Sequence, residues 1–166
     1  MICVVTETFL RPSVPDSFVT IDGYFLHRRD REVCRCRNKH CNKMHKGGGI
    51  LVYIHSRFTS EIFDVSVKCE SFWIKVSPSS NSEDGFISIN ASYHPPSNAS
   101  DDLLDYLTVT SSRIRENYPR SVEFLCGDFN RADLGEVETD CDLFILDSPP
   151  TRENAHLDAY KPTGSH

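Results

Sequence analysis

Short apolar runs, each bounded by a glycine, a proline or a polar residue, constrain the fold of this 166-residue chain more than any other feature. They predict strands at residues 2–6, 49–55, 71–76, 86–92 and 122–126. The run GILVYIH is rich in β-branched and aromatic residues and follows two further glycines, which is typical of a buried strand after a turn.

One amphipathic helix is expected between Pro96 and Pro119. Ser100 can cap its N-terminus, and the aspartates at 101 and 102 suit the positive end of the helix dipole. Its apolar face carries Leu103, Leu107, Thr110 and Ile114. This order of strands and helix predicts a layered α/β sandwich. The turn-rich stretch after residue 130 is interpreted as loops that bear a site within the same domain, 1–166.

The composition is that of an ordinary globular protein, with 39% hydrophobic and 25% charged residues. No apolar run is long enough to cross a bilayer, and the first ten residues lack the basic start of a signal peptide. We therefore expect an intracellular protein without a membrane partner. The seven cysteines are odd in number, and Cys3, Cys69 and Cys126 lie in apolar runs typical of buried free thiols.

Charge is distributed unevenly along the sequence. The net charge is −6, yet the segment 28–46 holds eight Lys/Arg and two Asp/Glu. A basic loop of this kind could steer a polyanion, and it could equally be an ordinary solvated loop. The surplus carboxylates elsewhere could serve a divalent metal.

Polar side chains suited to a metal or a phosphate follow four of the apolar segments. They are Glu7, Tyr93, the pair Asp128 and Asn130, and Asp158. Mg²⁺ takes one or two carboxylates together with water and phosphate oxygens, which Glu7 and Asp128 could supply if their strands are neighbours. Each motif alone is more typical of a turn, whereas their occurrence together at strand ends favours a site.

The stretch FLCGDFN carries the centre of this pattern. We expect its strand to bury residues 124–126 and Gly127 to let the chain turn. The two-residue spacing would then place Asp128 and Asn130 on one side, with Phe129 facing the other way.

The segments TETFL, GGGILVYI, SYHPP, LCGDFN and TRENAHLDAY occur in the order found in the endonuclease/exonuclease/phosphatase superfamily. Between residue 6 and about residue 160, the sequence most resembles the apurinic-like endonuclease domain of non-LTR (LINE-type) retrotransposons. The resemblance implies a two-sheet sandwich flanked by helices. It also implies a phosphodiesterase site at one rim that depends on Mg²⁺ or Mn²⁺.

The resemblance further implies a role for each matching residue. Glu7 would hold the metal, and Tyr93 would contact the scissile phosphate. Asp128 would position or deprotonate the attacking water, which Asn130 would orient. Asp158 matches the carboxylate that orients a catalytic histidine. The implied substrate-binding positions are Thr151, Arg152 and His94, the last where many relatives have arginine.

The sequence departs from the family pattern at both ends. The family has an earlier strand with a site asparagine and a final Ser-Asp-His strand, whereas this sequence starts at the second strand and ends in KPTGSH. His166 is interpreted as a tail residue rather than as the catalytic histidine. We therefore expect a fold that lacks the first and last strands, an unpaired sheet edge, and weak or no nuclease activity.

A segment rich in cysteine and histidine, CRCRNKHCNKMH, lies within the basic stretch. Cys34, Cys36 (or His40), Cys41 and His45 could supply the four ligands of a zinc ion. The Cys-x-Cys spacing strains a tetrahedral site, however, and arginines and lysines alternate with the cysteines. The sequence thus favours a flexible basic loop near nucleic acid over a zinc site.

Three functions remain open from the sequence. The first is a DNA-nicking endonuclease of retrotransposon origin, acting in the nucleus with a fused or associated reverse transcriptase. The second is a catalytically inactive remnant that binds nucleic acid or another partner. The third is a phosphatase acting on small molecules or lipids. The basic segment 28–46 favours a polymer such as DNA as the substrate.

Overall fold

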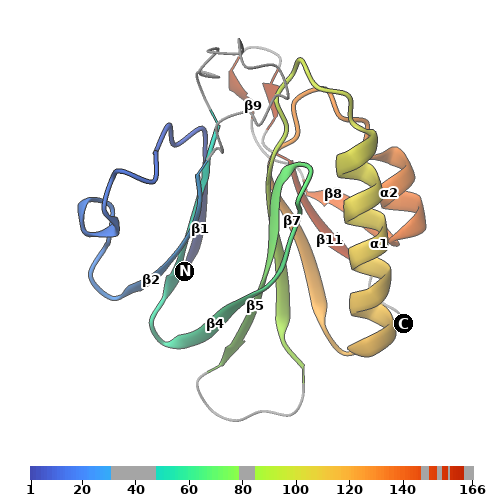
Figure 1. Ribbon diagram of the computed structural model, residues 1–166. Helices are drawn as coiled ribbons and strands as arrows, with labels where there is room; N and C mark the ends of the chain where they lie inside the picture. The colour runs from blue at the N-terminus through green and yellow to red at the C-terminus, as the bar shows by residue number, and fades with distance from the viewer. Residues whose placement is uncertain (31–47, 79–84, 147–149, 153–154, 157, 163–166) are drawn as a thin grey trace.

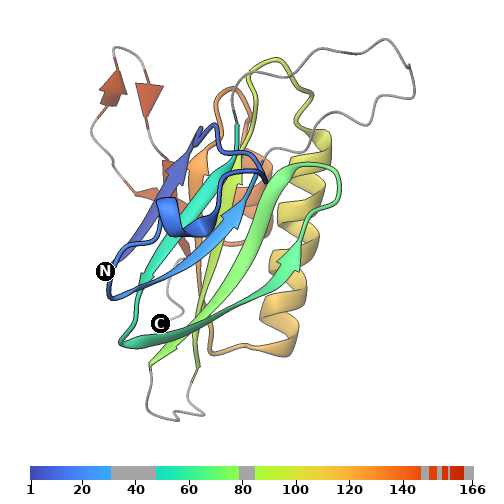
Figure 2. The same cartoon turned by 60° about the vertical axis from the view of Figure 1, so that its left-hand side comes forward.

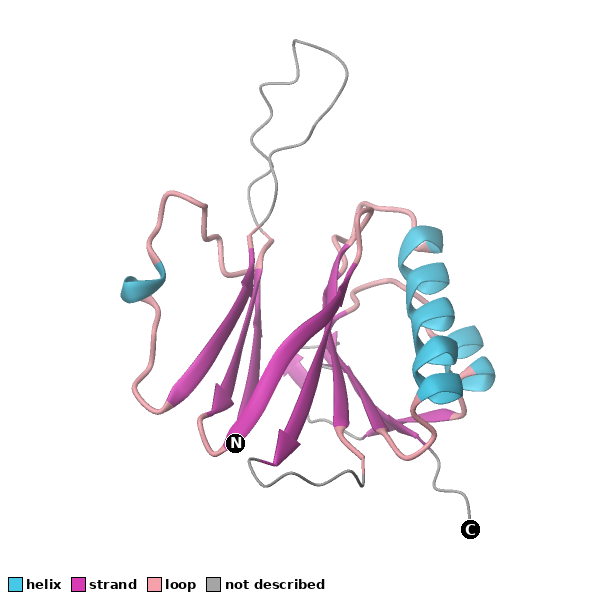
Figure 3. Ribbon diagram, turned by 60° about the horizontal axis from the view of Figure 1, so that its bottom comes forward, coloured by secondary structure: helices cyan, strands magenta, loops and turns pink. Residues whose placement is uncertain are grey.

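The computed structural model describes residues 1–30, 48–78, 85–146, 150–152, 155–156 and 158–162, with side chains described up to residue 143. Within these residues the elements form three layers: a three-stranded sheet, a six-stranded sheet and a layer of helices (Figure 1). The helices cover one face of the larger sheet, and the smaller sheet covers the other (Figure 3). This arrangement confirms the predicted α/β two-sheet sandwich.

The smaller sheet is antiparallel and lies in front of the larger one in Figure 2. In spatial order it consists of β1 (Ile2–Thr6), β3 (Ile50–His55) and β2 (Tyr24–Arg29). The central strand β3 is the buried strand predicted from GILVYIH. Among the described strands β1 pairs with β3 alone, so β1 forms one edge of this sheet.

The larger sheet contains one parallel pair, β6 and β7, whereas its other pairs are antiparallel. In spatial order it consists of β4 (Phe58–Val65), β5 (Glu70–Pro78), β6 (Ile87–Tyr93), β7 (Val122–Asp128), β11 (Asp158–Pro162) and β8 (Leu143–Leu146). A helix, α1 (Asp101–Asn117), connects β6 to β7 and returns the chain to the same end of the sheet. Both strands therefore finish side by side at the upper rim in Figure 1.

Alternation along the strands divides the apolar side chains between two cores. On β5, Phe72, Ile74 and Val76 face the smaller sheet, whereas Trp73 faces the helices. Burial of each such side chain stabilises the fold by roughly 1.5–3 kcal/mol. The two cores fix the order of the layers, and the strand ends between them are left to carry polar groups.

Helix α1 packs on the helix-side core as the sequence predicts. Its residues Leu103, Leu107, Thr110 and Ile114 are all buried. Ser100 is the N-cap residue, but its backbone is helical and its side chain makes no capping hydrogen bond. The predicted N-cap position is therefore confirmed, although the Ser100 hydroxyl lies 3.4 Å from Nε2 of His94 and does not cap the helix.

The first two residues of the basic segment predicted at 28–46 lie in a strand. Arg28 and Arg29 belong to β2, where both guanidinium groups are bound within the fold. Arg28 pairs with Asp16 and Asp30 at 2.6 and 2.5 Å. The expectation that these two arginines lie in a loop open to a polyanion is therefore wrong. Residues 31–47, with Cys34, Cys36, Cys41 and His45 among them, lie outside the described residues.

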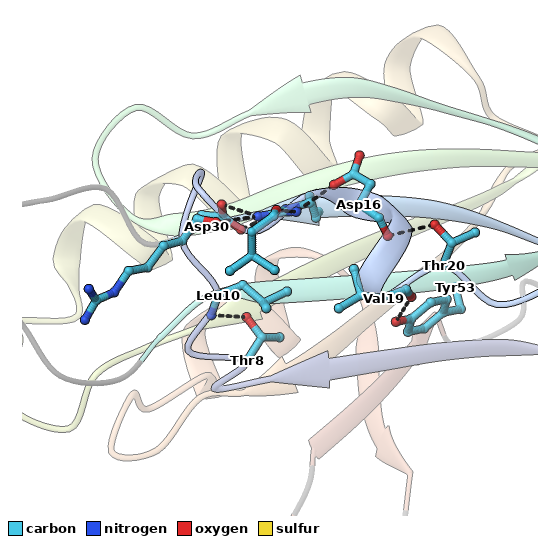
Figure 4. Close-up of polar contacts among 10 residues, drawn as sticks. Thr8, Leu10, Asp16, Val19, Thr20, Asp30 and Tyr53 are labelled. Carbon is cyan, nitrogen blue, oxygen red and sulfur yellow. Dashed lines mark hydrogen bonds and ion pairs between the residues drawn. The ribbon is translucent and has the colours of Figure 1, made fainter.

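The loop between β1 and β2 covers the outer face of the smaller sheet (Figure 4). The hydroxyl of Tyr53 donates to the carbonyl of Val19 at 2.6 Å, and Thr20 donates to the carbonyl of Asp16 at 2.8 Å. Asp16 begins a short 3₁₀ turn, η1 (Asp16–Phe18). Polar contacts thus hold this loop in place where few of its apolar side chains are buried.

The chain after residue 130 is more regular than the predicted loops. It forms α2 (Gly135–Asp140), and both β8 and β11 join the larger sheet, with β11 inserted between β7 and β8. The strands β9 (Pro150–Arg152) and β10 (Ala155–His156) form a separate hairpin at the upper end in Figure 1. The prediction of site-bearing loops is therefore wrong for α2, β8 and β11.

The thiols differ in their exposure. Cys3 is exposed on the edge strand, so the prediction that it is buried is wrong. Cys69 and Cys126 are partly buried, and burial raises the pKa of Cys126 to about 11. Cys141 is buried in the helix-side core.

Candidate active site

The parallel pairing of β6 and β7 places Tyr93 directly beside Asp128. Tyr93 belongs to the core between the two sheets, and Cys126 packs against the same core. Because side chains alternate along a strand, Asp128 leaves β7 on the same face as Cys126 and Tyr93. Both groups therefore face the smaller sheet at the rim of the sandwich.

Gly127 lets β6 and β7 approach each other at this rim. Its φ of +146° is rare for residues with a side chain, and an added Cβ would lie 1.9 Å from the carbonyl oxygen of Ser92. Gly127 is thus required for the close approach of two strands. The expectation that it starts a turn is wrong, because β7 continues through it to Asp128.

Glu7 reaches the same place from the smaller sheet. It follows β1 with a positive φ of 52°, and Phe9 has a φ of 56°. The amide of Phe9 donates to the carbonyl of Gly48 at 3.0 Å, which holds this bend against the start of β3. The hydroxyl of Tyr93 donates to Oε1 of Glu7 at 2.9 Å. Glu7 and Tyr93 therefore meet across the two sheets.

The turn after Asp128 begins with a buried residue and continues with an exposed one. Phe129 is 1% exposed and lies in the helix-side core, whereas Asn130 is exposed. The amide of Asn130 donates to Oδ1 of Asp128 at 3.1 Å, and Asn130 has a φ of 49°. A non-glycine residue held in this region of φ is a form of strain found at functional sites. Phe129 therefore faces the helix side, as predicted, whereas the placement of the Asn130 side chain on the side of Asp128 stays a prediction.

His94 links this turn to the start of α1. Its amide donates to the carbonyl of Asp128 at 2.8 Å, and its own carbonyl accepts from Nδ2 of Asn130 at 2.8 Å. His94 is 3% exposed, and burial lowers the pKa of its imidazole against the weaker opposing effects of the Asn98 backbone and the Asp128 carboxyl. The structure thus assigns His94 a role in holding the turn, while the expected contact with a phosphate stays a prediction.

The remaining predicted residues lie in strands of which the structure describes the backbone. Asp158 begins β11 and is paired with Gly127, so its backbone lies beside the end of β7. Thr151 and Arg152 belong to β9, in the hairpin drawn at the same end of the molecule (Figure 1). Their side chains, like His166, lie outside the described part of the chain.

The residues at the rim fit a hard divalent cation. Glu7 and Asp128 offer two carboxylates, and Mg²⁺ is commonly bound by one or two carboxylates with water and phosphate oxygens. Within the described residues, no group of three or more His, Cys, Asp or Glu side chains could hold a metal. The rim thus suits Mg²⁺ or Mn²⁺ completed by water and substrate better than a closed site made of protein ligands.

Two supporting features of the rim have no clear sequence signal. Oε2 of Glu70 accepts from the amide of Gly49 at 2.8 Å, which ties β5 to the start of β3. Behind Tyr93, Ser71, Asn90 and Ser92 form a cluster in which each residue is 0% exposed. Small polar residues inside predicted strands would have been the signal for the cluster, but they are equally typical of an exposed strand.

No protein-family model matches the chain, and no curated protein sequence matches it. Its fold, however, is similar to that of solved structures. The endonuclease domain of TRAS1, a telomere-specific non-LTR retrotransposon, superposes with a TM-score of 0.60 at 12% identity, covering 98% of this chain and 71% of that chain. The human Nocturnin catalytic domain with bound sulfate gives 0.57 at 17% identity, covering 96% and 68%.

A third similar structure is humanized D. rerio TDP2, with a TM-score of 0.56 at 12% identity, covering 98% of this chain and 68% of that chain. At sequence identities this low, structural similarity establishes the fold alone. None of the described helices is long and apolar enough to cross a membrane.

On the similarity to these three structures, the chain has the fold of the endonuclease/exonuclease/phosphatase superfamily, to which its sequence motifs are similar.

Proposed function

We propose that this chain is an endonuclease-type phosphodiesterase domain that nicks DNA with the help of Mg²⁺ or Mn²⁺. The observation that carries the proposal is the hydrogen bond between Tyr93 and Glu7, which come from different sheets, at the rim where Asp128 is paired with Tyr93. A fold similar to the TRAS1 endonuclease domain supports a retrotransposon origin. An associated reverse transcriptase and action in the nucleus are part of the proposal through the sequence resemblance. A similar D. rerio TDP2 structure, complexed with a single-strand DNA product, supports DNA as the substrate.

The residues of the rim suit the hydrolysis of a phosphodiester. The Asp128 carboxylate positions the attacking water and accepts its proton, because a carboxylate held in place can act as a general base. The side-chain amide of Asn130 orients the water or a phosphate oxygen. The Tyr93 hydroxyl contacts the phosphate once its proton turns away from Glu7, to which it donates in the free protein.

Glu7 would hold the metal ion together with the Asp128 oxygen that does not face the attacking water, and the ion would neutralise charge on the phosphate. Three further residues are proposed to act near the same rim, namely Asp158, Thr151 and Arg152. Asp158 would support the reacting groups from β11, and the other two would contact the nucleic acid backbone from β9.

We expect turnover by this chain to be slow. The histidines whose side chains the structure describes are His27, His55 and His94, and each has a ring nitrogen engaged elsewhere. These contacts are made with Ser60 at 2.8 Å, with the amide of Arg57 at 3.1 Å and with Ser100 at 3.4 Å. Each of the three therefore has one ring nitrogen committed to a contact within the fold. This observation favours, as the second candidate, a domain that binds nucleic acid without cleaving it.

A nicking assay tests the proposal. Supercoiled plasmid is incubated with the protein and Mg²⁺, and conversion to the open circular form is measured. We expect slow nicking that Asp128→Ala reduces by roughly 10²- to 10⁴-fold, the usual contribution of a general base. Asp102→Ala is the matched control, because Asp102 is an exposed carboxylate paired with Lys68.

The outcomes separate the candidates. Nicking that survives Asp128→Ala would place the chemistry elsewhere and refute the proposed site. Plasmid binding without nicking, at every metal concentration tested, would leave the non-catalytic binding domain as the better account.

A further inference from the structure

The cluster of Ser71, Asn90 and Ser92 is a closed ring of hydrogen bonds. Nδ2 of Asn90 lies 2.8 Å from Oγ of Ser71, which lies 2.7 Å from Oγ of Ser92, which lies 2.6 Å from Oδ1 of Asn90. Each hydroxyl has one proton, so all three contacts are hydrogen bonds only if Asn90 donates to Ser71, Ser71 to Ser92, and Ser92 back to Asn90. A closed ring of this kind strengthens its own bonds and fixes three side chains in one arrangement.

The ring lies directly behind the candidate site. Ser92 precedes Tyr93 on β6 and is paired with Gly127 on β7, so the ring is on the helix-side face while Tyr93 and Asp128 are on the opposite face. The carbonyl of Ser92 lies so close to Gly127 that no side chain would fit between them. A shift of the Ser92 backbone must therefore move Gly127, and with it Asp128.

Arg29 connects the ring to the smaller sheet. From the end of β2, its Nη1 donates to the carbonyl of Ser71 at 2.5 Å and its Nη2 to the carbonyl of Ser66 at 2.5 Å. The amide of Ser66 also donates to the carbonyl of Ser71 at 3.0 Å, which closes the bend between β4 and β5. One planar guanidinium thus donates to two carbonyls, one in β5 and one in the bend before it, a geometry that lysine does not reproduce.

This connection bears on the site because its groups come from different sheets. Glu7 follows a strand of the smaller sheet, whereas Tyr93 and Asp128 end strands of the larger sheet. Between these sheets the core is apolar, and apolar contacts are non-directional, so they set the spacing of the sheets better than their sideways alignment. A directional bond from Arg29 at the same rim supplies that alignment.

We propose that Arg29 and the ring of Ser71, Asn90 and Ser92 are a positioning unit that aligns Glu7 of one sheet with Tyr93 and Asp128 of the other. This inference rests on the proposed function for its catalytic consequence. Its structural content, the alignment of Tyr93 with Glu7, can be measured without turnover.

The experiment places 3-fluorotyrosine at position 93 and records its ¹⁹F NMR signal, with Glu7→Gln as the reference for a disturbed Tyr93 contact. Two variants test the unit, Arg29→Lys and Ser92→Ala. Their matched controls are Arg113→Lys, at an exposed arginine paired with Asp64, and Ser88→Ala. Ser88 is 0% exposed on the same face of β6 as Ser92, and its hydroxyl has no hydrogen-bond partner among the described residues.

We expect both test variants to move the Tyr93 signal toward that of Glu7→Gln, while both controls leave it unchanged. If the chain nicks DNA, kcat should fall by about 10- to 100-fold in Arg29→Lys with KM changed by less than about 2-fold, because small misplacements of reacting groups can cost this much. The change in kcat without a change in KM is not expected from a residue that merely stabilises the fold.

An unchanged Tyr93 signal in folded Arg29→Lys and Ser92→Ala, accompanied only by a lower melting temperature, would overturn the positioning role. If Arg29→Lys does not fold, the Tyr93 signals of Ser92→Ala and Ser88→Ala decide whether the ring has a positioning role. A wild-type protein that never nicks DNA, but whose Tyr93 signal responds as expected, would refute the proposed function and leave the positioning unit intact.

Discussion

The two faces of the six-stranded sheet differ in kind. The face toward the smaller sheet is apolar along its length, with Phe72, Ile74 and Ile89 in one core, and it becomes polar at the rim where Glu7 and Tyr93 meet. The face toward the helices carries polar groups within its interior. These buried groups are Ser71, Ser88, Asn90, Ser92 and Glu123, and Ser111 of α1 donates to the last of them.

The difference shows how one sheet can combine a dry core with an aligned site. Apolar packing on the inner face holds the two sheets together, but it tolerates small sideways shifts. Hydrogen bonds on the helix face do not tolerate such shifts, because a buried polar group that loses its partner lowers the free energy of unfolding by about 1–3 kcal/mol. The polar face thus fixes the strands whose ends carry the candidate site on the other face.

The largest effect is expected where the two faces meet, at Gly127. Gly127→Ala would bring a Cβ to 1.9 Å from the carbonyl of Ser92, so β6 and β7 must separate. We expect a loss of more than about 4 kcal/mol in the free energy of unfolding, or a protein that does not fold. Urea denaturation followed by circular dichroism measures it.

Gly23→Ala is the control for Gly127→Ala. Gly23 also has a positive φ, of 81°, but an added Cβ there would meet nothing within 4 Å. Its expected cost is only the backbone strain of about 1–2 kcal/mol. Equal costs at the two glycines would contradict the close approach of β6 and β7.

A smaller effect is expected from Glu123, which lies on the helix face of β7. Burial raises the pKa of this carboxyl, against the opposing influence of the Ser111 hydroxyl and of Arg115. The folded state therefore keeps its proton to a higher pH than the unfolded state does. The contribution of Glu123 to stability should fall as the pH rises from the unfolded pKa, near 4.3, through the raised folded pKa.

Glu123→Gln removes this pH dependence. We expect its free energy of unfolding, relative to the wild type, to be more favourable at pH 7 than at pH 4. Glu136→Gln, at an exposed position of α2, should show no such difference. A wild type that gains stability over Glu123→Gln as the pH rises would show that the carboxylate is stabilised by its neighbours instead.

The smallest effect is expected at Ser88, the other buried serine of β6. Because its hydroxyl has no hydrogen-bond partner among the described residues, Ser88→Ala should change the free energy of unfolding by less than about 1 kcal/mol. Ser92→Ala should cost about 1–3 kcal/mol, since it leaves Oδ1 of Asn90 without its donor and the Ser71 hydroxyl proton without its acceptor. Thermal denaturation of the two variants side by side measures the difference. Equal effects would mean that the ring contributes no more than an isolated hydroxyl.

The sequence predicted the inner face better than the helix face. Runs such as GILVYIH have the composition of buried strands, and the opposite placement of Asp128 and Phe129 follows from the alternation of side chains along β7. The apolar stripe of α1 was visible for the same reason. These features depend on residues close together in the chain, so their local pattern is sufficient to reveal them.

Features that depend on distant partners were not predictable. Strand β2 ends in two arginines, and their guanidinium groups are paired by Asp16, Asp30 and the carbonyls of the β4–β5 bend. Nothing local distinguishes these arginines from those of a solvated loop. In the same way, Ser71 and Ser92 become a ring only when β5 and β6 pair, and β11 joins the sheet between two strands that precede it in the chain.

The central claim is that Glu7 and Asp128 form one cation site across the two sheets. Electron paramagnetic resonance of free Mn²⁺, titrated with the protein, tests it directly. The account predicts one site, weakened at least about 10-fold by Glu7→Gln and by Asp128→Asn, and unaffected by Asp102→Asn. Mn²⁺ binding of the same affinity in the wild type and in both site variants would contradict it.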